Sequence, residues 1–152
     1  MKEQQLDRDL SRILGDRVTT NPQERWYYRT DVLKVPAWMD RLVKTMPDAV
    51  VAPQNAQEVS AVLNYCSDHL IPVTPRGAGS AGLFGAVPKR AGVVLDLRSL
   101  GGETDIDRLE KSVSCSAGMT WWELDRRLKR DGLTLMSYPS SARSATLAGW
   151  IM

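Results

Sequence analysis

Cysteine and histidine are scarce in this chain of 152 residues, which holds two cysteines and one histidine. They are too few for a structural zinc site built from four such ligands, so no metal site is expected. Cys66 falls on the apolar face of an expected helix and Cys115 in an expected strand, so both are predicted to be buried thiols. His69, near a helix end, is expected at the surface without a catalytic role.

The chain also lacks a large net charge and long apolar runs. The 20 basic and 18 acidic residues give a net charge of +2 and are interspersed, which argues against a nucleic-acid partner. No apolar run is long enough to span a membrane, and residues 1–9 are too polar for a signal peptide. We therefore expect a cytoplasmic, soluble chain of the size of one domain.

What the chain does contain is a glycine-rich run, Pro75-Arg76-Gly77-Ala78-Gly79-Ser80-Ala81-Gly82. From Gly77 onward it fits the G-x-G-x-x-G pattern of a Rossmann dinucleotide site, which must open a helix. Gly85 and Pro88 cost about 1 and about 3 kcal/mol inside a helix, so that interpretation is disfavoured. We predict instead a long loop between two strands, whose amides cradle an anion while Arg76 adds hydrogen bonds to phosphate.

Apolar periodicity and capping signals predict the order of the elements. Before the glycine run we expect a helix over 3–14 as an N-terminal appendage, an irregular lead-in over 16–48 with a short helix near 38–45, a strand over 49–53, a helix capped by Asn55 and Glu58, and a strand over 71–75. After it we expect strands over 92–97 and 108–118 with a turn at 100–102 between them, a helix opened by Thr120 and Glu123, and a strand starting at Leu133.

Several side chains allow more than one interpretation. Asp96 stands where Rossmann sites carry a ribose-binding acid, but a strand-end acid that caps nearby amides fits better. Of Trp121 and Trp122, one is expected in the core and the other half-exposed rather than stacked on a ligand. Arg76 can also be an ordinary surface arginine, and Ser140 and Ser141 can be simple turn residues.

The chain ends on apolar residues over 144–152, as if cut in the middle of an element. A lead-in over 1–48 and a domain over 49–152, truncated on its C-terminal side, are the parts that we expect.

An ordered set of segments resembles the FAD-linked oxidases of the vanillyl-alcohol oxidase/p-cresol methylhydroxylase superfamily. Within that superfamily the chain is most similar to the branch of the glycolate oxidase flavoprotein subunit and D-lactate dehydrogenase. The segments are Tyr28-Arg29-Thr30-Asp31, residues 47–53 with Glu58-Val59, residues 71–80, residues 92–97, Ala117-Gly118-Met119-Thr120, Pro139-Ser140-Ser141 and Thr146-Leu147-Ala148-Gly149.

The resemblance implies an α+β fold of the p-cresol methylhydroxylase (PCMH) type, with FAD lodged between two α+β subdomains. The first subdomain would be a small sheet containing a βαβ unit, and the second would be present only in part. The implied FAD contacts are a pyrophosphate loop, Pro75, Arg76, Gly77, Ala78, Gly79, Ser80, Ala81, Gly82 and Leu83, and a second loop against the flavin and its phosphates, Pro139, Ser140, Ser141, Thr146 and Gly149.

Departures from the superfamily pattern refine this expectation. Many members carry a histidine directly after R-G-x-G and bind flavin covalently there, whereas this chain has Ser80, so non-covalent FAD is expected. Residues 81–84 and Ala148 also differ from the common pattern. The residues that bind and deprotonate a substrate belong to the portion that follows Met152 in the superfamily, so no catalytic residue is expected in this chain.

The resemblance thus implies a FAD-dependent oxidoreductase that acts on the CH-OH group of a 2-hydroxy acid such as glycolate or D-lactate. An electron-transfer partner subunit would accompany such an enzyme. The fragment alone would be inactive. The alternative is a FAD-binding module that acts alone or completes another chain and catalyses nothing by itself.

Overall fold

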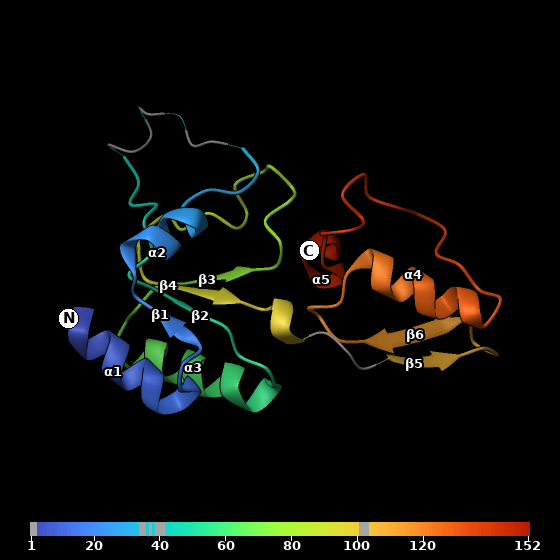
Figure 1. The fold of residues 1–152 in the computed structure, drawn as a ribbon, viewed down its shortest axis with the longest axis horizontal. Helices are drawn as coiled ribbons and strands as arrows, with labels where there is room; N and C mark the ends of the chain where they lie inside the picture. Colours follow the sequence, from blue (N-terminus) through green and yellow to red (C-terminus); the bar gives the residue numbers. More distant parts are fainter. Residues whose placement is uncertain (1–2, 34–35, 37, 39–41, 101–103) are drawn as a thin grey trace.

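The computed structural model describes residues 3–33, 36, 38, 42–100 and 104–152. The elements in chain order are α1 (Glu3–Leu14), β1 (Val18–Thr19), α2 (Pro22–Tyr28), β2 (Ala49–Val51), α3 (Ala56–Asp68), β3 (Val73–Arg76), β4 (Val93–Asp96), the 3-10 helix η2 (Arg98–Leu100), β5 (Thr104–Asp107), β6 (Ser112–Cys115), α4 (Trp121–Arg130) and α5 (Leu147–Ile151). Figure 1 shows a first lobe that ends near η2 and a second lobe that starts at β5.

The first lobe is organised by a four-stranded sheet in the order β1-β2-β4-β3. β2 and β3 both run parallel to β4, and Val93 pairs with Ala49 on one side and with Val73 on the other. The crossover through α3 therefore passes over β4, whose residues are all buried. Burial on both faces is typical of a parallel strand with an unbroken apolar sequence, as we predicted for residues 92–97.

Helices α1 and α3 pack against one face of this sheet. Figure 1 draws them together on the lower side of the sheet and α2 on the upper side. The core of the first lobe consists of Leu6, Leu10, Leu14, Ala49, Val51, Val62, Cys66, Val93 and Leu95. The helix over 3–14 was predicted with its bounds, but it is not an appendage, because its leucines are part of this core.

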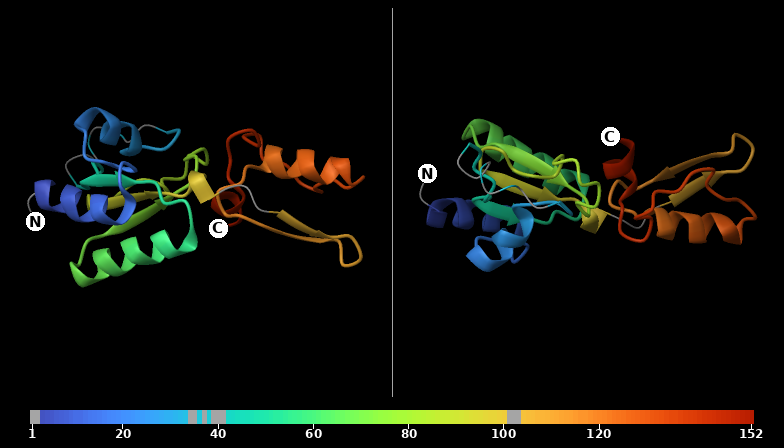
Figure 2. Two further views of the ribbon diagram at one scale, coloured as in Figure 1. Left: turned by 60° about the horizontal axis from the view of Figure 1, so that its bottom comes forward. Right: turned by 90° about the horizontal axis from the view of Figure 1, so that it is seen from above.

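The second lobe combines the antiparallel hairpin β5–β6 with α4 and α5. It is seen from two further sides in Figure 2. The Thr120 hydroxyl accepts from the Glu123 amide and the Glu123 carboxylate accepts from the Thr120 amide, which confirms the predicted capping box. The core of this lobe consists of Met119, Trp121, Leu124, Leu128, Ala145 and Leu147.

In the second lobe one predicted strand was too long and another was wrong. The strand expected over 108–118 is limited to Ser112–Cys115, because the Asp107 carboxylate caps the amides of Leu109 and Glu110 and so forms a turn. Its partner β5 was not expected. Leu133 starts no strand, since the Thr134 hydroxyl donates to Asp125 on α4 and ties the segment to that helix instead.

The lead-in over 16–48 is more regular than expected, because it contains β1 and α2. Asn21 caps α2 and Pro22 follows at its first turn, a combination typical of a helix start. The short helix expected near 38–45 falls partly outside the described residues, and 42–45 are not helical. The turn expected at 100–102 also falls largely outside them.

Candidate cofactor-binding site

The glycine loop leaves the carboxyl end of β3 and returns to the sheet at β4. No helix forms over residues 77–92, which confirms the prediction of a long loop between two strands. Gly79 and Gly82 adopt left-handed φ angles of 66° and 68°, which favour glycine. Within the described ranges, the amides of residues 77–83 donate no hydrogen bond to protein, whereas the next amide, that of Phe84, donates to Asp31. A series of backbone donors is therefore left for a ligand.

Arg76, at the end of β3, points into the protein. Its Nη1 donates to the carbonyl of Thr30 at 2.7 Å and to that of Ala86 at 3.4 Å. The guanidinium lies 5.2 Å from the centre of the Tyr28 ring. The residue is only 7% exposed, so an ordinary surface arginine is the wrong interpretation. Burial lowers the pKa of Arg76, and the carbonyls accept its hydrogen bonds in place of water.

The second predicted loop begins as a turn. The amide of Ala142 donates to Pro139, and the amides of Ser144 and Ala145 donate to the carbonyl of Ser141. Pro139, Ser140 and Ser141 make no hydrogen bond with the glycine loop in the described part of the chain. The same loop continues to Thr146, which is buried and forms a bridge to Thr120 just before α5.

The two loops meet at Gly77 and Thr146. A Cβ atom placed on Gly77 would lie 2.1 Å from Oγ1 of Thr146, and one placed on Gly149 would lie 2.9 Å from the same atom. Only glycine fits at Gly77 without a shift, because neighbouring atoms rarely come within 3 Å of a Cβ. The fold therefore brings together three of the predicted site residues, Gly77, Thr146 and Gly149, from two lobes.

Asp96 anchors a polar cluster at the same end of the sheet. Its carboxylate accepts hydrogen bonds from the Arg98 amide at 3.1 Å, from Nη2 of Arg98 at 2.6 Å and from the Tyr28 hydroxyl at 2.9 Å. Burial acts to raise the pKa of Asp96, but the hydrogen bonds from Arg98 and Tyr28 outweigh it and the pKa is lowered. The prediction of a strand-end acid that caps an amide is confirmed.

Tyr28 and Arg98 were not predicted as site residues. Burial and the neighbouring Asp96 raise the pKa of Tyr28, which therefore stays a neutral hydrogen-bond donor. The available signal was the tyrosine in Tyr28-Arg29-Thr30-Asp31, a segment that carried the family resemblance without an assigned contact.

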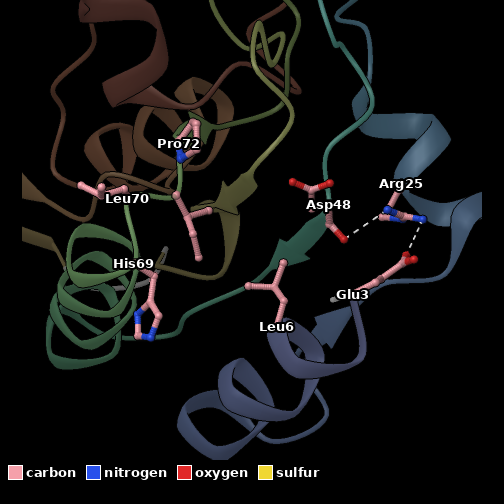
Figure 3. A pocket seen from close by; sticks show the side chains of 8 residues that line it. Glu3, Leu6, Arg25, Asp48, His69, Leu70 and Pro72 are labelled. Carbon is pink, nitrogen blue, oxygen red and sulfur yellow. Dashed lines mark hydrogen bonds and ion pairs between the residues drawn. The ribbon is translucent and has the colours of Figure 1, made fainter. Parts of the chain in front are cut away.

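A hollow of about 280 Å³ lies at the other end of the sheet, where β2 and β3 begin (Figure 3). Arg25 forms an ion pair with Glu3 at 2.7 Å and donates to the carbonyls of Pro47 and Asp48. The Asp48 carboxylate accepts from the amide of Gly92. The charged groups drawn in Figure 3 thus find partners within the protein, unlike the amides of the glycine loop.

Other predicted features are also placed by the structure. Cys66 is buried as predicted and burial raises its pKa to about 11, whereas Cys115 is only partly buried. His69 is exposed, and Trp121 is buried while Trp122 is 40% exposed, as predicted.

No group of three or more acidic, histidine or cysteine side chains in the described residues is placed to hold a metal ion. Among those residues, no helix has the length and apolar character needed to cross a membrane.

Relatives in sequence match about two thirds of the chain. The chain is 33% identical to glycolate oxidase subunit GlcD of Bacillus subtilis, over 70% of this chain and 23% of that protein. It is 38% identical to D-lactate dehydrogenase of Archaeoglobus fulgidus, over 67% of this chain and 23% of that protein. The chain thus spans about a quarter of the length of these relatives.

Solved structures show the same fold. A structure of alkyldihydroxyacetonephosphate synthase aligns with 99% of this chain and 29% of that chain, at a TM-score of 0.81 and 25% identity. Substrate-bound p-cresol methylhydroxylase aligns with 96% of this chain and 28% of that chain, at a TM-score of 0.76 and 20% identity. The predicted α+β fold of the PCMH type is confirmed.

The family itself follows from a direct match. The model of the family described as "FAD binding domain" matches residues 47–152, a range that contains the glycine loop, Asp96, Arg98 and the second loop. The resemblance to FAD-linked oxidases is thereby confirmed. The chain belongs to the FAD binding domain family, and its cofactor is FAD.

Proposed function

We propose that this chain is the FAD-binding part of a flavin-dependent oxidoreductase that oxidises a 2-hydroxy acid of the glycolate or D-lactate type. The observation that carries the proposal is the identity of 33% and 38%, over 70% and 67% of this chain, to relatives named for glycolate and D-lactate. Similarity to alkyldihydroxyacetonephosphate synthase makes a different substrate class the main competitor. The relative GlcD is named as a subunit, and we extend the proposal to an electron-transfer partner subunit.

The residues of the glycine loop fit the pyrophosphate of FAD. Within the described ranges their amides meet no protein acceptor, and an oxygen-rich anion can accept several such bonds at once. Gly77 lets the backbone approach Thr146, and Gly79 and Gly82 adopt the left-handed conformation without strain. We assign the pyrophosphate contacts to this loop, Pro75, Arg76, Gly77, Ala78, Gly79, Ser80, Ala81, Gly82 and Leu83, with Arg76 acting from within the protein.

The second loop completes the proposed site. Thr146 precedes α5 but its side-chain oxygen accepts no capping hydrogen bond from that helix, and a threonine hydroxyl can both donate and accept. We assign Pro139, Ser140, Ser141, Thr146 and Gly149 to the flavin side of the cofactor. Bound FAD supplies the hydride acceptor, and the described residues hold and orient it. We assign no catalytic base to these residues.

Ser80 supports a non-covalent link to the cofactor. A serine hydroxyl can donate a hydrogen bond to phosphate, but it has no nucleophilic ring nitrogen that could form the histidyl link known in the superfamily. Acid precipitation of the purified full-length protein is therefore expected to release its flavin into the supernatant. Flavin that stays with the precipitate would contradict the non-covalent assignment.

The substrate proposal is tested by anaerobic bleaching of the flavin. We expect the absorbance of the purified full-length protein near the flavin maximum to fall on addition of glycolate or D-lactate, and to return with an electron acceptor. A colourless protein that takes up no added FAD would refute the cofactor assignment in this chain. Yellow protein that no 2-hydroxy acid bleaches would refute the substrate class and favour the non-catalytic FAD-binding module.

A further inference from the structure

The segment that follows α2 runs beside the glycine loop, although the two are far apart in sequence. In Figure 1 the light-blue chain after α2 lies next to the yellow-green loop after β3. We call residues 28–33 the clasp. The clasp contacts the loop through the backbone of Thr30 and Val32 and through the side chains of Tyr28 and Asp31.

Asp31 is the central polar side chain of the clasp. One carboxylate oxygen accepts from the amide of Leu33 at 2.9 Å, and the other accepts from the amide of Phe84 at 2.7 Å. The amide of Val32 donates to the carbonyl of Gly79 at 3.0 Å. The clasp thus holds the loop at Gly79 and at Phe84, on either side of residues 80–83.

Arg76 holds the same loop from inside the protein. Its Nη1 joins the carbonyl of Thr30 in the clasp to the carbonyl of Ala86 beyond the loop. The guanidinium lies against the backbone of Gly79, where an added Cβ would be 2.5 Å from Nη2. Its place in the loop is therefore that of an internal brace, with Nη1 directed at two protein carbonyls.

Apolar contacts and conformational entropy also support a glycine loop that the clasp holds in one shape. A Cβ on Gly82 would lie 3.1 Å from Cγ1 of Val32 and 3.2 Å from Cγ of Leu33, so the loop backbone rests on the clasp. Ordering each residue of a free loop costs roughly 1–2 kcal/mol, and a loop already held in its bound shape avoids that cost when the ligand arrives. Contacts that hold the loop before a ligand arrives therefore favour binding.

We propose that the clasp pre-organises the glycine loop for FAD, and that Asp31 and Arg76 are positioning residues whose hydrogen bonds aim the loop amides at the pyrophosphate. The proposal rests on the assignment of this loop to FAD under the proposed function. It adds a role for residues 28–33, which precede the segment that matches the family, and it gives Arg76 a structural task in addition to its proposed place at the pyrophosphate.

The test compares Asp31→Ala with Asp107→Ala in the full-length protein. Asp107 is a matched control, because its carboxylate also accepts two backbone amides but lies in the β5–β6 turn of the other lobe. We expect Asp31→Ala to raise the Kd for FAD about tenfold, as loss of hydrogen bonds to a charged group predicts, and Asp107→Ala to leave it unchanged. Asp31→Asn keeps one acceptor oxygen and should recover part of the affinity.

Hydrogen–deuterium exchange of the apoprotein supplies a readout that needs no variant. The amide of Phe84 should be protected before FAD is added, and those of residues 80–83 should exchange fast until FAD is bound. If wild type binds FAD but Asp31→Ala binds it equally well, or if the Phe84 amide is unprotected in the apoprotein, the clasp proposal is overturned. If wild type itself binds no FAD, the proposed function fails instead.

Discussion

The two ends of the first sheet differ in the hydrogen bonds that their backbone amides make. At the amino end, the amides of Asp48, Gly92 and Val93 donate to protein oxygens at 2.6, 2.9 and 2.8 Å. At the carboxyl end, the amides of residues 77–83 donate to no protein acceptor in the described part of the chain. Of residues 77–83 only Gly82 is buried, so most of these amides lie where solvent or a ligand can reach them.

The same difference separates the glycine-loop end from the hollow of Figure 3. In that hollow Arg25, the strongest candidate for holding an anion, is neutralised by Glu3. We therefore expect the amino end to serve stability and the carboxyl end to serve FAD binding. Matched substitutions at the two ends should show two different losses.

The largest effect is expected at the amino end, from Gly92→Ala. Gly92 has a φ of 77°, and an added Cβ would lie 2.1 Å from the carbonyl oxygen of Pro72. Left-handed strain and overpacking together should lower the free energy of unfolding by about 3 kcal/mol. Urea unfolding measures this loss. The Kd for FAD, taken under conditions where the variant is folded, should match wild type; a large rise would break the distinction between the two ends.

Gly77→Ala makes the corresponding change at the carboxyl end. The added Cβ meets Oγ1 of Thr146 and separates the two loops, so we expect the Kd for FAD to rise about tenfold or more. Gly85→Ala is the control, because an added Cβ there has no neighbour within 4 Å. Flavin fluorescence titration compares the three proteins. Equal affinities for all of them would show that the loops need not approach each other.

The smallest expected effect is on the pH dependence of stability. The pKa of Asp96 is lower in the folded chain than in the unfolded one, so its contribution to stability is complete above about pH 4 and is lost as the pH falls through the lowered value. Asp96→Asn should cost about 1–2 kcal/mol at pH 7 and make the unfolding free energy less dependent on pH below about 4. Urea unfolding at several pH values tests this. Parallel curves for both proteins would contradict it.

The helices that could be predicted are those whose sequence carries both a stripe and a cap. The leucines of α1 and the caps of α3 and α4 fall into this class. Helix α2 buries no residue, so it has no apolar stripe to detect. Only Asn21 and Pro22 indicate its start in the sequence. Leu109 misled the strand prediction, because its apolar side chain is 92% exposed in a turn that the Asp107 carboxylate forms.

The candidate site was predictable where it is local and unpredictable where it is not. Gly85 and Pro88 were enough to show that no helix follows Gly82. The approach of Gly77 to Thr146 joins two lobes, and no pattern in either segment indicates it. The buried position of Arg76 depends on the carbonyls of Thr30 and Ala86, and a backbone acceptor has no signature in sequence.

Pro75 has a consequence for how the protein behaves in a crowded solution. It lies exposed in β3, which is an outer strand of the first sheet. A proline has no N–H to offer, so a strand from another molecule finds a donor missing where it would begin to pair. Pro75, at the start of the glycine-rich run, therefore also discourages edge-to-edge aggregation.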